Sequence, residues 1–186
     1  MNLTIGKLEQ AALEARNQRK YDYYASVKFN YSEIYDLFVS HSFRDRNLVI
    51  GLYYLFEKAG YKVYIDWIND SGLNRSSVDS ETAALIKARI KQSKGTAYIS
   101  TENSTSSKWC PWELGVADGM YGKVCILPIM SSAFVGQEYL SLYPYLDYAP
   151  IEGSLRYDFW VQDQKNINRY TRLENWLSGK DLLVHQ

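Results

Sequence analysis

The chain has 186 residues, of which 46% are hydrophobic and 23% charged, a composition typical of a soluble domain with a sizeable core. Lysine plus arginine and aspartate plus glutamate both number 21, and the resulting net charge of zero argues against a nucleic-acid or membrane partner held by bulk electrostatics. With only Cys110 and Cys125, and no apolar run of roughly 18 residues, we expect a cytoplasmic protein without a disulfide framework, a Cys/His metal cluster or a membrane span.

The first third of the chain alternates helical and extended patterns. Residues 1–20 are typical of a charged amphipathic helix, and an aromatic connector leads to a short apolar strand over 35–40. Residues 46–60 have leucines at helical spacing, with Gly60 at the position that a left-handed residue occupies after a helix. A second strand is expected over 61–66.

The same alternation continues beyond this point. A long polar loop over 67–78 precedes a helix over 79–92, whose basic end is expected to face solvent. A strand over 95–100, a Ser/Thr loop and a helix over 108–120 come next, with Pro111 tolerated in the first helical turn. Weaker patterns complete the chain, and they predict the following elements: a buried strand over 123–129, a short helix near 134–142, an edge strand near 145–150 and a final helix near 164–178.

Strands that alternate with helices indicate βαβ units and a parallel sheet. In an open parallel sheet, ligands bind beyond the carboxyl ends of the strands, where the strand order reverses. Three segments should therefore lie near one another, namely "SHSFRD", "IDWIND" and "STENSTSSKWCPWE". Neither glycine-rich phosphate motif, G-x-G-x-x-G after a strand or G-x-x-x-x-G-K-[ST], accompanies them, which argues against a Rossmann dehydrogenase or a P-loop NTPase.

Glu113 is an acid set into the apolar stretch "KWCPWELGVADGM". Trp109 lies one helical turn before it, so both side chains share a face. One interpretation is a partly exposed acid that the helix dipole favours. The other is a site carboxylate that binds sugar hydroxyls and offsets positive charge at an anomeric carbon. A single carboxylate suits nicotinamide as leaving group, because nicotinamide departs neutral from a pyridinium and needs no general acid. Spacing alone leaves both interpretations open.

The other candidate groups also have two readings each. His41 is either an acid/base group or a polar turn residue. Arg44 suits bidentate phosphate binding, while Ser42 or Asp45 suits the cap of the next helix. Asp66 and Trp67 begin the long loop, which is either functional or a mobile surface segment. Cys110, in a first helical turn, is either a nucleophile paired with His41 or a small core residue.

Three of these segments together resemble TIR domains. "YDLFVSHSFRDR" is similar to their opening strand, of the form (Y/F)D-(V/I)-F-(I/V)-S-(H/Y)-(A/S)-x-x-D. "GYKVYID" with its long loop is similar to their second strand and BB loop, and "YISTENSTSSKWCPWEL" to their third strand and the W-x-x-x-E helix start. Their order and intervals match, and the resemblance runs over about 33–150.

The resemblance implies an α/β, flavodoxin-like three-layer fold with a central five-stranded parallel sheet. It also implies NAD⁺ glycohydrolase or ADP-ribosyl cyclase chemistry, with NAD⁺ as substrate and with no metal and no resident cofactor. Glu113 matches the catalytic glutamate, and Trp109 matches the tryptophan beside the nicotinamide. The segments that line the cleft correspond to these substrate-binding candidates: His41, Ser42, Phe43, Arg44, Asp66 and Trp67.

The predicted domain organisation is a TIR domain over 33–150 between short helical extensions over 1–32 and 151–186. This build is similar to the TIR subunit of Thoeris anti-phage systems. That similarity implies a cyclic ADP-ribose isomer as a signal that reaches a separate effector, and self-association through TIR–TIR contacts. The alternative function is a scaffold without enzymatic activity, acting by self-association and partner binding. Scaffold-only members often lack the acid that Glu113 provides here.

Overall fold

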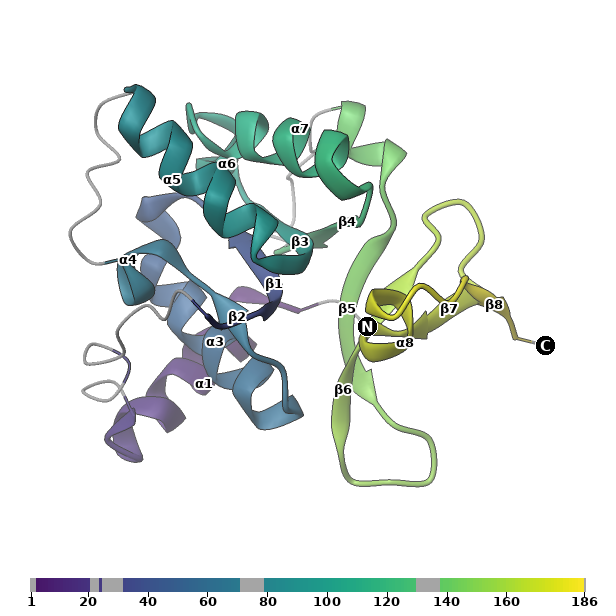
Figure 1. Ribbon diagram of the computed structural model, residues 1–186. Coiled ribbons are helices and arrows are strands. Elements are labelled where there is room, and N and C mark those ends of the chain that lie inside the picture. The colour runs from purple at the N-terminus through teal and green to yellow at the C-terminus, as the bar shows by residue number, and fades with distance from the viewer. Residues whose placement is uncertain (1–2, 21–23, 25–31, 71–78, 130–137, 186) are drawn as a thin grey trace.

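A computed structural model covers the chain and describes all residues except 1–2, 21–23, 25–31, 71–78, 130–137 and 186 (Figure 1). Within these described ranges, eight strands form one sheet in the order β2-β1-β3-β4-β5-β6-β7-β8. The strands have the following bounds: β1 Tyr35–Ser40, β2 Val63–Tyr64, β3 Ser93–Ser100, β4 Val124–Pro128, β5 Tyr145–Pro150, β6 Tyr157–Gln162, β7 Arg169–Arg172 and β8 Leu183–Val184. The pairs among β1 to β5 are parallel, and the pairs from β5 to β8 are antiparallel.

The predicted fold class is confirmed, because the five parallel strands have the order 2-1-3-4-5 of flavodoxin-like folds. Helices cover both faces of this sheet (Figure 1), with α1 and α3 on one face and α5 and α7 on the other. The helical segments have the following bounds: α1 Ile5–Asn17, η1 Phe43–Asp45, α3 Arg46–Ala59, α4 Asp66–Asn69, α5 Ser80–Lys91, α6 Glu102–Thr105, α7 Cys110–Tyr121, η2 Glu138–Leu142 and α8 Leu173–Leu177. None of the helices in the described ranges is long and apolar enough to cross a bilayer.

Helix α3 ends where the sequence predicts. Gly60 follows α3 with φ +90°, a left-handed conformation that glycine adopts without a steric penalty. The backbone N–H groups of Gly60 and Tyr61 donate to the carbonyls of Glu57 and Phe56, which satisfies the last turn of the helix.

The C-terminal part of the chain differs from the prediction. The helix expected over 164–178 is wrong, because β7 and the short α8 occupy most of that range, and the segment over 145–150 is an internal strand rather than an edge strand. The sheet thus gains three antiparallel strands beyond β5, and the expected helical C-terminal extension holds these strands with one short helix, α8. The proposed boundaries of the three domains stay predictions. Of the short helix expected near 134–142, the described part is η2, and the rest lies outside the described residues.

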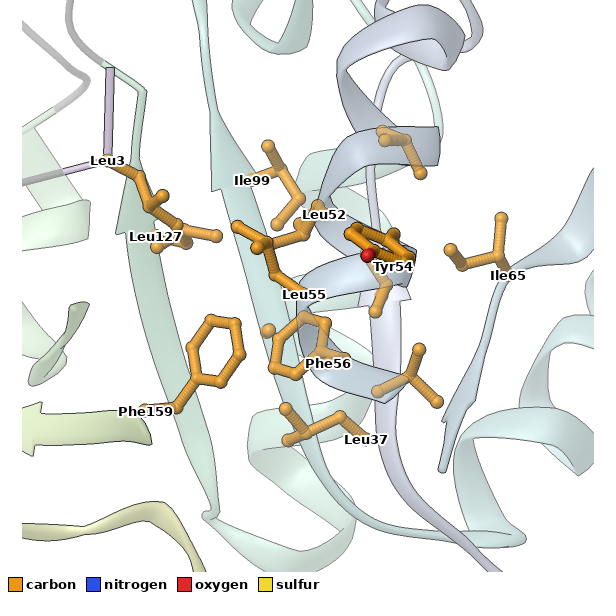
Figure 2. Packing of buried hydrophobic residues seen from close by; sticks show 14 of the residues in the cluster. Leu3, Leu37, Leu52, Tyr54, Leu55, Phe56, Ile65, Ile99, Leu127 and Phe159 are labelled. Atoms are coloured by element: carbon orange, nitrogen blue, oxygen red, sulfur yellow. The ribbon is translucent and has the colours of Figure 1, made fainter. Parts of the chain in front are cut away.

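The larger hydrophobic core lies between the sheet and the pair α1 and α3 (Figure 2). Phe56 of α3 stacks on Phe159 of β6, with ring centroids 4.0 Å apart, so the antiparallel strands contribute to the same core. Leu8, Ala11, Ala12 and Ala15 are buried, which confirms the apolar stripe of the first helix.

Gly51 of α3 lies where α1 crosses at close range. A Cβ atom at this position would lie 2.0 Å from the carbonyl oxygen of Leu8 and 3.1 Å from the backbone nitrogen of Ala12. Both atoms belong to the backbone of α1, so they cannot move aside unless α1 itself is displaced. Only glycine permits this crossing.

We expect Gly51→Ala to destabilise the protein by about 2 kcal/mol, because α1 must shift away from α3. Gly119→Ala is the matched control, since Gly119 lies in the exposed part of α7 with nothing within 4 Å of the added Cβ. The control should gain about 0.5–1 kcal/mol through helix propensity. Urea unfolding of both variants measures the difference, and equal stabilities would contradict the close crossing.

Candidate functional site

The candidate site lies at the carboxyl ends of β1 and β3. These two strands are neighbours, and the connections from them run to opposite sides of the sheet, so the strand order reverses between them. Ser40 ends β1 and is in register with Tyr98 of β3. The segments after both strands, together with the first turns of α7, surround this edge. The sequence predicted this convergence of the segments after β1 and β3, and the topology confirms it.

Glu113 lies on the inward face of α7. It shares the i, i+3, i+4, i+7 stripe that places side chains against a core, and the buried members of that stripe are Cys110, Glu113, Leu114 and Ala117. The side chain is 0% exposed, which rules out the partly exposed acid of the first interpretation. The Ser40 hydroxyl donates to Oε2 of Glu113 over 2.6 Å.

The start of α7 is fixed by a serine and a proline. The hydroxyl oxygen of Ser107 accepts from the backbone N–H groups of Trp109 and Cys110, at 3.3 and 3.2 Å. Pro111 lies in the first turn, where its missing N–H costs no hydrogen bond. Ser107 thus satisfies two of the free N–H groups at the helix start.

The two tryptophans beside Glu113 differ in burial. Trp109 is only 6% exposed and belongs to the core between the sheet and α7, so it shares the buried side of the helix with Glu113 as predicted. Trp112 is half-buried and meets Trp109 edge-to-face at 5.4 Å between ring centroids. Lys87 of α5 places its Nζ 5.7 Å from the Trp112 ring, so the exposed side of Trp112 faces α5.

His41 connects the end of β1 to α4. An indole N–H can only donate, so the bond of 3.1 Å from Nε1 of Trp67 makes Nε2 of His41 an acceptor. Nδ1 then carries the proton and donates to the carbonyl of Val39 over 2.9 Å. Both ring nitrogens of His41 are thus engaged, and Oδ1 of Asp66 lies 3.5 Å from Nε2. The structure brings His41, Asp66 and Trp67 together, and Ser40 joins them to Glu113.

Asp66 and Trp67 occupy a different local structure from the one predicted. The sequence indicated a strand through Asp66 and a loop from Trp67, but β2 ends at Tyr64 and residues Asp66–Asn69 form the short helix α4. Oδ1 of Asn69 accepts from the backbone N–H of Ile65, which closes this turn. The remainder of the predicted loop, over 71–78, lies outside the described residues.

The loop after His41 forms the turn η1. Ser42 is buried, and its hydroxyl oxygen accepts from the backbone N–H of Arg44 over 3.4 Å, so Ser42 caps this turn. Phe43 and Arg44 are exposed, and Phe43 exposes 58% of its surface. The guanidinium of Arg46 lies 5.6 Å from the Phe43 ring centroid. Phe43 and Arg44 therefore reach solvent near the site, whereas Ser42 has a structural bond.

Asp45 has a role that sequence reasoning missed. Its side chain makes no cap for α3, although the residue occupies the cap position. Its carboxylate instead accepts from Thr101 Oγ1 and Asn103 Nδ2, both at 2.6 Å, and it is buried. Asp45 therefore ties the loop after β1 to the segment after β3. A sequence signal for this pairing is absent, because the partners are more than 50 positions apart.

The geometry also decides the proposed Cys110–His41 pair and the question of a metal site. Cys110 is buried and free of disulfide bonds, and both ring nitrogens of His41 contact other groups, so the two do not form a nucleophile–base pair here. Within the described ranges, no group of three His, Cys, Asp or Glu side chains could hold a metal ion. The buried carboxylate of Glu113, hydrogen-bonded by Ser40 at the strand ends, can offset a positive charge that develops on a ligand.

Residues 37–175 match the family described as TIR domain. The chain is 41% identical over 157 residues to "Probable 3' cyclic ADP-D-ribose synthase ThsB'" of Bacillus cereus (strain MSX-D12), covering 82% of this chain and 80% of the relative. "Putative cyclic ADP-D-ribose synthase TIR2" of Cytobacillus dafuensis is 37% identical over 83 residues, or 44% of this chain and 22% of the relative. A solved TIR domain of the Toll-related receptor TRR-2 from Hydra magnipapillata is 24% identical, with a TM-score of 0.46, over 61% of this chain and 83% of that chain.

Proposed function

Because this chain belongs to the TIR domain family, we propose that it cleaves the nicotinamide–ribose bond of NAD⁺ and closes the remaining ADP-ribose into a cyclic isomer. The names of both bacterial relatives describe cyclic ADP-D-ribose synthases, which supports a cyclase over a simple glycohydrolase. The observation that carries the proposal is the buried carboxylate of Glu113, held by Ser40 at the strand ends where the strand order reverses.

In the proposed reaction the bond between the ribose anomeric carbon and the pyridinium nitrogen breaks. Its electron pair stays with nicotinamide, which leaves as a neutral molecule. The ribose acquires cationic character, and the carboxylate of Glu113 stabilises that charge and hydrogen-bonds a ribose hydroxyl. No protonation of the leaving group is needed, so one carboxylate suffices and no metal or resident cofactor enters the scheme.

The second step decides the product. A hydroxyl or an adenine nitrogen of the same molecule attacks the anomeric carbon and loses a proton, which gives a cyclic ADP-ribose isomer. Water in the same position would give linear ADP-ribose. The 3' cyclic form named for the Bacillus cereus relative is the first candidate product. We assign Trp109 to the nicotinamide side of the site. The residues that we assign to the walls of the NAD⁺ site are His41, Ser42, Phe43, Arg44, Asp66 and Trp67.

Access to Glu113 requires a rearrangement, because the carboxylate is 0% exposed in this structure. A substrate cannot reach it until neighbouring segments move. We therefore propose that the protein rests in an inactive state and that association with further copies opens the site. The cyclic product would act as a signal to a separate effector in anti-phage defence.

The proposal is tested by incubating the purified chain with NAD⁺ over a range of protein concentrations, with and without lysate from phage-infected cells. Chromatography and mass spectrometry then follow nicotinamide and the nucleotide product. We expect stoichiometric nicotinamide and a product with the mass of cyclic ADP-ribose, compared by retention with the 3' cyclic standard. NAD⁺ left intact under every condition would refute the enzyme and favour the scaffold function.

A further inference from the structure

Ser40 contacts Glu113 directly, although its position in the sequence suggests only the end of a strand. Along β1, side chains alternate between the two faces of the sheet, so Ser40 lies on the same face as Phe38. That face packs against α5 and α7, and Phe38 belongs to the same core as Leu114 of α7. The alternation therefore aims the Ser40 hydroxyl at the helix that carries Glu113.

We propose that Ser40 is a positioning residue that fixes the Glu113 carboxylate for the reaction, an inference that rests on the proposed function. Its hydroxyl is 0% exposed and lies 2.6 Å from Oε2 of Glu113. The contact joins β1 to α7 over 73 positions of sequence, across the point where the strand order reverses. It is a tertiary contact, and local chain geometry does not require it.

Both ends of this hydrogen bond are anchored. Ser40 is held by the ladder between β1 and β3, in which Val39 and Ser40 are in register with Ala97 and Tyr98. Glu113 is held by the helical bond from its backbone N–H to the carbonyl of Trp109, at 2.8 Å. A carboxylate on a flexible side chain would rotate, whereas this bond fixes the position of one of its oxygens.

The bond has two consequences for the proposed chemistry. A hydroxyl that donates to a carboxylate favours its ionised form, which is the form that stabilises a ribosyl cation. A fixed oxygen also keeps the charge at a constant distance from the anomeric carbon, and a misplacement of about 1 Å can reduce turnover by about 10²-fold. Ser40 thus acts through Glu113, and we do not assign it a contact with NAD⁺.

Ser40→Ala tests this role, with Ser40→Cys as a second variant that keeps the shape of the side chain but donates only weakly. Ser93→Ala is the matched control, because Ser93 is also buried and hydrogen-bonded, to the carbonyl of Arg89 at 3.1 Å, but starts β3 at the opposite edge of the sheet. Steady-state nicotinamide release gives kcat and KM for each variant, and urea unfolding gives their stability.

We expect kcat to fall by about 10- to 100-fold in Ser40→Ala and Ser40→Cys, with KM within about threefold, because only the placement of the charge changes. Ser93→Ala should keep the wild-type kcat even if it loses stability. Wild-type kcat in the folded Ser40 variants, or a loss confined to KM, would overturn the proposal. Glu113→Gln in the same assay separates the two ideas, since full activity of that variant would remove the catalytic role of Glu113, whereas NAD⁺ left intact by the wild-type chain would refute the proposed function itself.

Discussion

Replacing Glu113 by glutamine should reduce nicotinamide release by about 10³-fold while leaving the fold intact. Glutamine has nearly the same shape, and its amide oxygen can still accept the hydroxyl of Ser40, so the buried position stays filled and bonded. What the variant lacks is the negative charge that offsets the developing ribosyl cation. The measurement is the initial rate of nicotinamide release from NAD⁺, with circular dichroism to verify the fold.

Glu174→Gln is the control for this substitution. Glu174 also lies in the first turn of a helix, α8, but it is exposed and belongs to the C-terminal part of the chain. Glu113→Asp adds a second comparison, because it keeps the charge and withdraws it from Ser40 by about one methylene. We expect an intermediate loss of about 10²-fold for aspartate. A glutamine variant as active as the wild type would leave the carboxylate without a catalytic role.

The sequence allowed the central part of the fold to be predicted because its signals are local. Apolar runs at 35–40 and 123–129 suit strands covered on both faces, and both are strands in the structure. Gly60 marks the end of α3 through its own backbone conformation. The parallel topology then brings the segments after β1 and β3 to one edge, so Glu113 could be placed near the loop after β1 before any contact was known.

The antiparallel strands were missed because their pairing is not local. In Tyr157–Gln162 the buried residues are Asp158, Phe159 and Val161, so the segment does not alternate strictly and gives weak evidence for a strand without its neighbour. The neighbour is β5, and the buried Asp158 is further bound by the hydroxyl of Tyr61 and the guanidinium of Arg172. None of these partners follows from the periodicity of the segment itself.

The candidate site likewise contains residues that the sequence indicated and contacts that it did not. Residue types and spacing indicated Glu113, Trp109 and the two loops, whereas the partners of Ser40 and Asp45 lie 73 and 56 positions away. Residue type alone also misplaced Arg89, which was expected on a solvent-exposed basic face. Its side chain is only 3% exposed, because Asp70 lies opposite it at the end of α4.

We expect Arg89→Met to destabilise the protein by about 3 kcal/mol, since it leaves a largely buried carboxylate without its cation. Nε and Nη2 of Arg89 donate to the two oxygens of Asp70 at 2.7 and 3.2 Å. The hydroxyl of Tyr64 also donates to Asp70, over 2.8 Å, and burial followed by the charge of Asp70 raises the pKa of this hydroxyl, so it remains a donor. Urea unfolding at neutral pH measures the loss.

A double-mutant cycle separates the ion pair from the packing of the Arg89 side chain. Asp70→Asn in the Arg89→Met background removes the orphaned charge. The double variant should therefore lose less stability than the sum of the losses measured for the two single variants. Lys91→Met changes an exposed cation on the same helix and should alter stability by no more than about 0.5 kcal/mol. Additive losses would mean that Arg89 stabilises α5 by packing alone. Coupled losses would identify the pair as the link that holds α4, and with it the Trp67–His41 bond, against α5.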